Sequence, residues 1–365
     1  SGTKSIGIYS AGGTVNQNGT LNIGNTGVGV YSTNGTVNIG PATFNFGTDG
    51  AVGVYATNSN VANASAMSVG DKNYGFILTS GTFTNTATNI TLGSDSVFVY
   101  NSGAVTITNG AVTTLTMTGS DNIGYYTVNG GTVANDGIIT GTAGNNNVGI
   151  YNTGGSITNT GTVNVGNSDL VYVLDATGAP TTEVDVANSK YSVGLYGEKS
   201  TVVNTATGNI SVGAGGIGIK TKGGTGTNDG TITGVGNNTR GMYTEGGIIT
   251  NNGTITITGN DVIGMAGNGK DSKVINNGTI TVTGDGAIGI FGNSGTVITN
   301  AGTIIATGDG SEGIVVSQGS TLNNAVNGTM IVNGLTSGNE AKTVGTTYQT
   351  PTIINSGVIK VSEKF

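Results

Sequence analysis

The chain has 365 residues, of which 69 are Gly, 3 are Pro and none is Cys or His. Without Cys there is no disulfide or thiol chemistry, and without His no Ser-His-Asp arrangement can form. The net charge of -7 leaves no basic footprint for nucleic acid, and no apolar run of about 18 residues is present to span a membrane as a helix. We therefore expect no nucleic-acid partner, no membrane insertion by this chain, no metal and no cofactor.

The chain is built from one repeated unit, whose first strand has the pattern x-Gly-[Ile/Val]-Tyr. Fourteen copies of this anchor follow one another at intervals of about 23–24 residues. The apolar positions are mainly Val and Ile, with abundant Thr, which favours strands over helices. In two copies Phe98 and Val171 take the place of the anchor glycine. The other anchors are Gly7, Gly29, Gly53, Gly75, Gly124, Gly149, Gly194, Gly218, Gly241, Gly264, Gly289 and Gly313.

The copy at Val148–Asp169 shows how one unit would fold. It reads as three short strands separated by Gly/Asn corners. Along the first strand, alternation places Val148 and Ile150 on one side. Gly149 and Tyr151 would then point to the other side. Such a unit cannot bury its apolar side alone, but stacked copies can. The sequence therefore predicts an all-β protein, a single right-handed parallel β-helix of about 15 rungs with three short strands per rung.

An Asn recurs in the second strand pattern, [Ile/Val]-x-Asn-x-Gly. It falls at the same offset in six successive units after Asn159 and again in the C-terminal tail. Stacked Asn amides can hydrogen-bond along the axis and satisfy one another at a buried corner. We interpret this row as structural rather than as a polar stripe for a ligand. The six are Asn204, Asn228, Asn251, Asn276, Asn300 and Asn324, and the tail position is Asn355.

Two stretches break the repeat. Residues 171–192 fit the period as an irregular rung, but Pro180 and acidic residues stand where the Asn strand is expected. Residues 337–351 interrupt the last rung and are predicted to leave the coil as a loop. Both ends of the chain lie in strand patterns without a polar cap. We therefore expect residues 1–365 to be one continuous β-helix that is truncated at both ends.

A stripe of aromatic residues, expected to face outward, lies two positions after the anchors. Beside each Tyr is a Gly without a side chain, so the stripe would flank a shallow groove where rings could stack on sugars or hold cationic side chains. The alternative is an aromatic ladder that stabilises the sheet. Val173 and Lys220 are among the residues that interrupt the stripe. The candidate ligand-binding tyrosines are Tyr100, Tyr126, Tyr151 and Tyr196.

Acidic residues offer two further candidate sites. Asp175, Glu183 and Asp185 lie in the irregular rung, and segments that leave a rigid scaffold often carry function. They are also the nearest analogue here of the carboxylate clusters of polysaccharide-cleaving enzymes. Separately, Asp recurs at the corner before the anchor, where it can hydrogen-bond its own turn; Ca²⁺ held by stacked carboxylates is the alternative. These corner residues are Asp49, Asp71, Asp95, Asp121, Asp261, Asp285 and Asp309.

Copies such as GIYNTGGSITNTGTVNVGNSD and GIFGNSGTVITNAGTIIATGDG resemble the passenger domains of fusobacterial autotransporter adhesins of the type V secretion class. The resemblance covers essentially the whole chain. It implies a right-handed parallel β-helix that is secreted and anchored through a C-terminal outer-membrane β-barrel, which this sequence does not include. It also implies a place on the bacterial cell surface, with glycans or proteins of host cells or other bacteria as partners.

These observations together predict a non-enzymatic segment of a bacterial cell-surface adhesin. Arg240, the only Arg in the chain, is interpreted as a surface cation. A purely structural β-helical stalk of a larger autotransporter is the first alternative, and a polysaccharide-degrading enzyme is the second. The tyrosine stripe and the irregular rung favour the adhesin, because a stalk would need neither.

Overall fold

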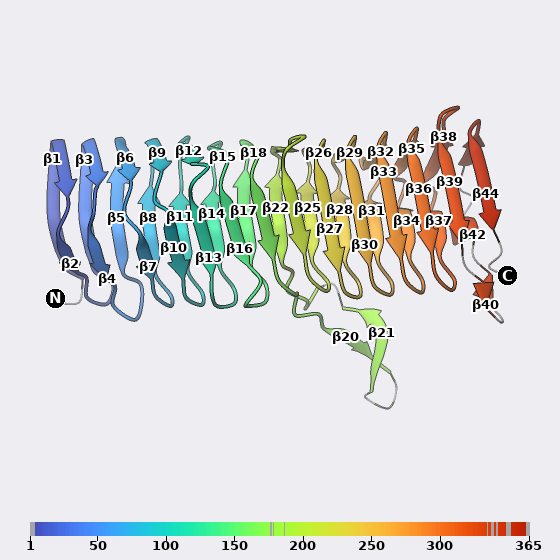
Figure 1. Cartoon of the computed structure of the whole chain (residues 1–365), viewed down its shortest axis with the longest axis horizontal. Helices are drawn as coiled ribbons and strands as arrows, with labels where there is room; N and C mark the ends of the chain where they lie inside the picture. The colour runs from blue at the N-terminus through green and yellow to red at the C-terminus, as the bar shows by residue number, and fades with distance from the viewer. Residues whose placement is uncertain are drawn as a thin grey trace.

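The protein is a straight rod of stacked strands (Figure 1). Its computed structural model describes residues 4–362 except 176, 178, 186, 334, 337–338, 341 and 348–351. The described residues form strands and turns and provide no helix able to cross a membrane. Strands of successive turns pair in parallel, and each turn has three of them. The predicted all-β parallel helix with three strands per turn is confirmed.

Each turn contributes one strand to each of three faces. The first face contains β1 (Ile6–Gln17), β3 (Val28–Ile39), β5 (Val52–Thr57), β8 (Tyr74–Leu78), β11 (Val97–Asn101), β14 (Ile123–Thr127), β17 (Val148–Thr153), β22 (Val193–Glu198), β25 (Ile217–Lys222), β28 (Arg240–Glu245), β31 (Ile263–Asn268), β34 (Ile288–Asn293), β37 (Glu312–Ser317) and β42 (Lys342–Thr347).

The second face begins with the ends of β1 and β3, which run through both faces. It continues with β6 (Ser59–Asn63), β9 (Gly81–Asn85), β12 (Thr106–Asn109), β15 (Thr132–Asn135), β18 (Ser156–Asn159), β23 (Thr201–Asn204), β26 (Thr225–Asn228), β29 (Ile248–Asn251), β32 (Lys273–Asn276), β35 (Val297–Asn300), β38 (Thr321–Asn324) and β43 (Thr352–Asn355).

The third face closes each turn. It contains β2 (Thr20–Asn22), β4 (Thr43–Asn45), β7 (Met67–Val69), β10 (Asn89–Leu92), β13 (Thr114–Met117), β16 (Ile138–Gly141), β19 (Thr162–Val165), β24 (Asn209–Val212), β27 (Thr231–Val235), β30 (Thr254–Thr258), β33 (Thr279–Thr283), β36 (Thr303–Thr307), β39 (Thr329–Asn333) and β44 (Val358–Ser362). Four short strands lie outside the three faces: β20 (Tyr172–Leu174), β21 (Pro180–Val184), β40 (Leu335–Thr336) and β41 (Asn339–Glu340).

The core runs along the inside of the coil and consists of stacked apolar side chains. In β19, Val163 and Val165 are buried. Thr162 and Asn164 of the same strand are partly exposed, as alternation predicts. Burying one such aliphatic side chain contributes about 1.5–3 kcal/mol. A single turn has too few of them to fold alone, so stability comes from stacking turn on turn.

The anchor glycines face the core, which corrects the alternation expected for the first strand. In β17 both Gly149 and Ile150 are buried. Val148 is partly exposed, as is Tyr151. A Cβ placed on Gly149 would lie 2.6 Å from the carbonyl oxygen of Gly194 in the next turn, and as close to a core side chain. The backbone turns toward the core at the glycine, so strict two-residue alternation fails there.

The recurring Asn residues form a buried ladder, as predicted. Asn159 Nδ2 donates to Oδ1 of Asn204 at 2.7 Å, and its own Oδ1 accepts from Asn135 Nδ2 at 2.7 Å. The Asn159 amide also donates to the carbonyl oxygen of Gly161 in its own turn at 3.2 Å. Within the described part of the chain, eleven Asn–Asn bonds of 2.7–3.2 Å connect Asn63, Asn85, Asn109, Asn135, Asn159, Asn204, Asn228, Asn251, Asn276, Asn300, Asn324 and Asn355.

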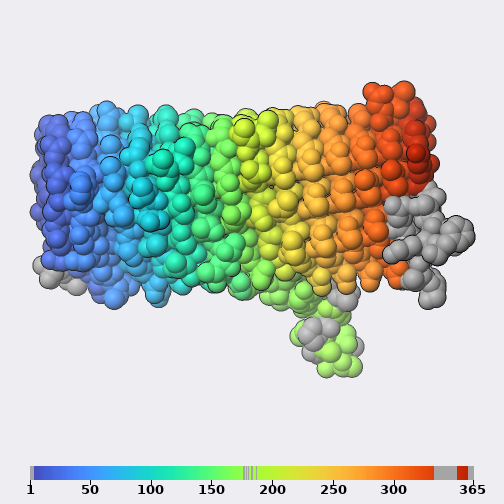
Figure 2. Space-filling view, viewed as in Figure 1, coloured from blue at the N-terminus to red at the C-terminus, as the bar shows by residue number. Residues whose placement is uncertain are grey.

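Residues 171–192 do not form a rung, so the predicted number of rungs is too high. Strands β20 and β21 pair antiparallel and project from the rod as a hairpin (Figures 1 and 2). Tyr151 pairs directly with Tyr196 across this excursion, and Asn159 bonds to Asn204. Thirteen successive parallel pairings among the described strands connect β1 to β42 along the first face. From β1 to β42 the coil therefore makes about 13 turns, which is fewer than the expected 15 rungs.

The predicted loop at 337–351 lies partly outside the described residues. Of its described part, β42 pairs in parallel with β37, which places Val344 opposite Ile314. Strand β42 thus belongs to the first face. Residues 337–338, 341 and 348–351 of the predicted loop are outside the described residues.

Candidate ligand-binding surface

Four predicted site residues form one outward column on the first face. Tyr100, Tyr126, Tyr151 and Tyr196, here called the tyrosine column, occupy paired positions on β11, β14, β17 and β22. Adjacent ring centroids are 5.3, 4.8 and 4.7 Å apart, with interplanar angles of 67–89°. This is the edge-to-face packing that aromatic quadrupoles favour. The expected interruption at Val173 does not occur, because Val173 lies in the hairpin.

The tyrosine column is held in place by burial and by one ionic group. Partial burial raises the pKa of Tyr126 and Tyr151 above its usual value, and it raises the pKa of Tyr196 to about 12. Tyr151 Oη donates to Glu198 Oε2 at 3.0 Å. Glu198 Oε1 also lies 3.6 Å from Lys222 Nζ. The rings therefore form a packed, oriented surface whose outer edges remain partly exposed.

The tyrosine column does not flank the glycine-lined groove that the sequence suggested. Because the anchor glycines face the core, the outward neighbours of the rings are the aliphatic residues that precede each glycine. These neighbours make the surface an aromatic and aliphatic strip rather than a groove. Three of them are partly exposed: Ile123, Val148 and Val97, the last of which precedes the inward Phe98. The fourth, Val193, is buried.

Beyond Tyr196 the column continues with a cation. Lys220 pairs with Tyr196 on one side and Tyr243 on the other, and its Nζ lies 5.0 and 6.0 Å from their ring centroids. The Tyr191 ring is 5.9 Å from the same nitrogen. Arg240 Cζ lies 5.8 Å from the Tyr243 ring. Both cations are within cation–π distance of rings.

The sequence alone did not predict this cationic group, because Lys220 there interrupts the stripe and Arg240 reads as a surface cation. The available signal was their offset from the anchors: Lys220 stands two residues after Gly218, and Arg240 stands directly before Gly241. Both offsets place a side chain outward on the first face, on adjacent turns.

The three acidic candidates lie on the hairpin, apart from the tyrosine column. Asp175 follows β20, and its Oδ1 accepts from the Thr177 backbone N–H at 2.8 Å. Asp185 follows β21 and accepts from Asn188 Nδ2 at 2.7 Å, a bond that lowers the pKa of Asp185. Glu183 lies within β21. The register of the hairpin places Asp175 and Asp185 toward its opposite ends, where their hydrogen bonds turn the chain.

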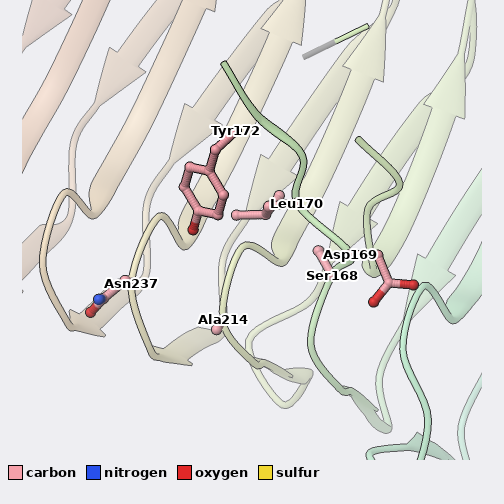
Figure 3. Close-up of a pocket in the computed structure, with 6 residues that line it drawn as sticks. All are labelled: Ser168, Asp169, Leu170, Tyr172, Ala214 and Asn237. Atoms are coloured by element: carbon pink, nitrogen blue, oxygen red, sulfur yellow. The ribbon is translucent and has the colours of Figure 1, made fainter. Parts of the chain in front are cut away.

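A cleft of about 480 Å³ lies where the hairpin meets the rod (Figure 3). The Asp169 carboxylate at its edge accepts from Asn145 Nδ2 at 2.7 Å. Tyr172 Oη accepts from Asn238 Nδ2 at 3.4 Å. The cleft contains none of the predicted site residues, because it forms between turns that are distant in sequence. Its lining residues are Ser168, Asp169, Leu170, Tyr172, Ala214 and Asn237.

The corner Asp residues do not stack at one position. Asp95, Asp121 and Asp261 adopt φ of 55–58°, a left-handed conformation that Asp tolerates at turns. Asp285 and Asp309 stand one position earlier in their units, and Asp309 N–H donates to Asp285 Oδ1 at 3.1 Å. In the described part of the chain, no three His, Cys, Asp or Glu side chains lie together as ligands for a metal ion.

Comparisons with known proteins give little further information. No family model matches the chain, and no curated protein matches its sequence. Among solved structures, the chain is similar to the crystal structure of a TibC-catalyzed hyper-glycosylated TibA55-350 fragment. The likeness covers 96% of this chain and 100% of the other, with 13% identity and a TM-score of 0.31. The function of this chain therefore has to be inferred from its own residues.

Proposed function

We propose that the protein is a non-enzymatic segment of a bacterial cell-surface adhesin, and that the tyrosine column contacts glycans or proteins of host cells or other bacteria. The observation that carries this proposal is the outward register of four tyrosines on four successive turns. The resemblance of the repeats to autotransporter passenger domains supports a location at the bacterial cell surface.

A rigid rod suits this role because its contacts repeat at a fixed spacing. The rings of the tyrosine column are 4.7–5.3 Å apart, so an extended ligand can touch several of them at once. One exposed ring contributes about 0.5–1 kcal/mol to holding a cation by its face. Several such contacts on one ligand combine into useful avidity, because each later contact is intramolecular.

The test is binding to a glycan array and to partner bacteria. We expect the unmodified protein to bind and the Tyr126→Ser/Tyr151→Ser double variant to lose most of that binding, because the two central rings are removed. The matched control is Thr140→Ser/Asn164→Ser, which changes two partly exposed positions on the third face. Equal binding by all three proteins would exclude the tyrosine column as the contact surface.

A structural stalk is the second candidate, and one observation favours it. Each ring of the tyrosine column packs edge-to-face on its neighbours, which stabilises a sheet without any ligand. Absence of binding by the unmodified protein in the array would support the stalk. Release of reducing sugar from a polysaccharide substrate would instead support an enzyme.

A further inference from the structure

The first face carries one concentrated group of charges, on β22, β25 and β28. Lys220 and Arg240 stand on adjacent turns beside the end of the tyrosine column. Glu245 lies on the same strand as Arg240. Lys222, two residues after Lys220, lies between two carboxylates: it is near Glu198 of the preceding turn and pairs with Glu245 of the following turn. The chain as a whole has a net charge of -7. In this group, by contrast, two cations lie beside aromatic rings.

The N–H groups of Lys220 and Arg240 have no acceptor among the described residues. In the described part of the chain, neither Lys220 Nζ nor the Arg240 guanidinium has a hydrogen-bond or ion-pair partner. Burial lowers the pKa of Lys220; the Glu245 carboxylate opposes this shift, and the Arg240 charge adds to it. Ammonium and guanidinium groups together offer eight N–H donors in principle. A partly buried cation of this kind is stabilised by an external anion.

A small cavity lies between these cations. Its volume is about 50 Å³, and Tyr191, Lys220, Arg240, Tyr243 and Glu245 line it together with one aliphatic side chain. The Tyr191 hydroxyl is buried and has no hydrogen-bond partner among the residues that the structure describes. A buried hydroxyl without a partner costs free energy. This cavity thus joins an unpartnered hydroxyl donor to two unpaired cations.

We propose that this cavity binds the carboxylate of an acidic sugar residue, with Lys220, Arg240 and the Tyr191 hydroxyl as donors. The inference rests on the proposed function, because it names one ligand class for the same face of the rod. Two cations outweigh the single carboxylate of Glu245 at the cavity, so an anion is favoured. The volume suits a carboxylate and not a whole sugar ring, which would remain outside.

The rings around the cavity favour a sugar over an acidic peptide. Tyr196 and Tyr243 stand on either side of Lys220 and are both partly exposed. Aromatic rings of this kind can pack against the apolar side of a sugar ring. The Arg240 guanidinium can hold a carboxylate with two parallel hydrogen bonds. The acid group would thus enter between the cations while the ring rests on the tyrosines.

The test compares two sugars that differ only at one carbon, methyl glucuronide with a carboxylate and methyl glucoside with a hydroxymethyl group. Binding is measured by ligand-observed NMR titration of the full chain. We expect the glucuronide to bind about tenfold more tightly, a difference of about 1.4 kcal/mol. Lys220→Gln and Arg240→Gln should each remove most of this preference. Added salt should weaken binding of the glucuronide and leave the affinity for the glucoside unchanged.

Lys273→Gln is the matched control, because Lys273 is exposed on the second face. Arg240→Lys should keep part of the preference, since it retains the charge but not the bidentate geometry. Equal affinity for the two sugars, or an unchanged preference in Lys220→Gln, would overturn the inference. Binding of an acidic peptide without binding of the glucuronide would overturn it as well. In these cases the proposed adhesin function stands if the Tyr126→Ser/Tyr151→Ser variant still loses array binding.

Discussion

The asparagine ladder and the tyrosine column are both stacks of one residue type in parallel register, but they differ in how strictly they repeat. The ladder is unbroken from Asn63 to Asn355. The outward position of the column changes from Tyr to Ile77 before it and to Lys220 after it. A buried amide that loses its partner costs about 1–3 kcal/mol, whereas a half-exposed ring loses only part of its contacts. Burial therefore enforces identity at the corner, and partial exposure leaves the outward position free to vary.

The largest effect is expected from breaking the ladder. Asn159→Ala removes the bonds to Asn135 and Asn204 and leaves amide groups buried without their partners. We expect the free energy of unfolding to fall by about 2–4 kcal/mol, measured by urea denaturation. Asn164→Ala, at a partly exposed position of the third face, should change it by less than about 0.5 kcal/mol. If the two variants lost the same free energy of unfolding, burial of the ladder amide would not be what makes Asn159 important.

A slightly smaller effect is expected at the anchor glycines. Gly149→Ala places a Cβ 2.6 Å from the Gly194 carbonyl oxygen, and the turn has to shift to make room. We expect a loss of about 1–3 kcal/mol. Gly19→Ala is the control, because nothing lies within 4 Å of its Cβ position. The same urea titration compares them, and a neutral Gly149→Ala would mean that the turns are not closely packed there.

High pH should destabilise the first face, where the tyrosine column lies. The pKa of Tyr196 is raised from 10.0 to about 12 by burial, so the folded state holds this proton more tightly than the unfolded state. The corresponding stability is fully present below pH 10 and is lost as pH rises through about 12. Circular dichroism, followed together with tyrosinate absorbance, should show loss of structure as pH rises through this range, and Tyr196→Phe should reduce the loss. An equal loss of stability in Tyr196→Phe and in the unmodified protein would contradict the burial of this hydroxyl.

The smallest effect is expected from removing the hairpin. Lys190 N–H donates to the Asp169 carbonyl oxygen at 3.0 Å, so a short glycine link can replace the segment between these two residues. The ion pair between Lys190 and Asp121, at 2.9 Å, is exposed to solvent and therefore adds little to stability. We expect the urea midpoint to move little, because Tyr151 and Tyr196 already pair across the excursion. If the protein that lacks the hairpin unfolds, the hairpin supports the coil.

Most of the fold was predictable because the repeat fixes which residues stack. The constant offset of the Asn residues predicted a buried ladder, and its bonds are present from Asn159 onward and also before it. The inward turn at Gly149 was not predictable from alternation, since a bend in the backbone changes which way a side chain points. Residues 171–192 match one period in length, but they contain Pro180 and lack the ladder Asn. That missing Asn was the available sign of an excursion.

The candidate site was predictable only in part. The anchors place Tyr100, Tyr126, Tyr151 and Tyr196 in one row, and the structure brings them into contact. The cavity beside Lys220 could not be read from the chain in the same way. It depends on Tyr191, which follows the hairpin and reaches Lys220 only once the excursion folds out of the coil.

The asparagine ladder also gives the rod a dipole along its axis. Each of the eleven bonds runs from Nδ2 to the C-terminal neighbour. At several positions a carbonyl of the same turn also accepts from the amide and holds it in that orientation, such as Gly137 for Asn135 and Gly230 for Asn228. Aligned dipoles polarise one another, which strengthens each bond by roughly 10–30%. A substitution in the middle divides one long dipole into two short ones. The free-energy cost of losing an Asn should therefore depend on its place along the rod as well as on its own contacts.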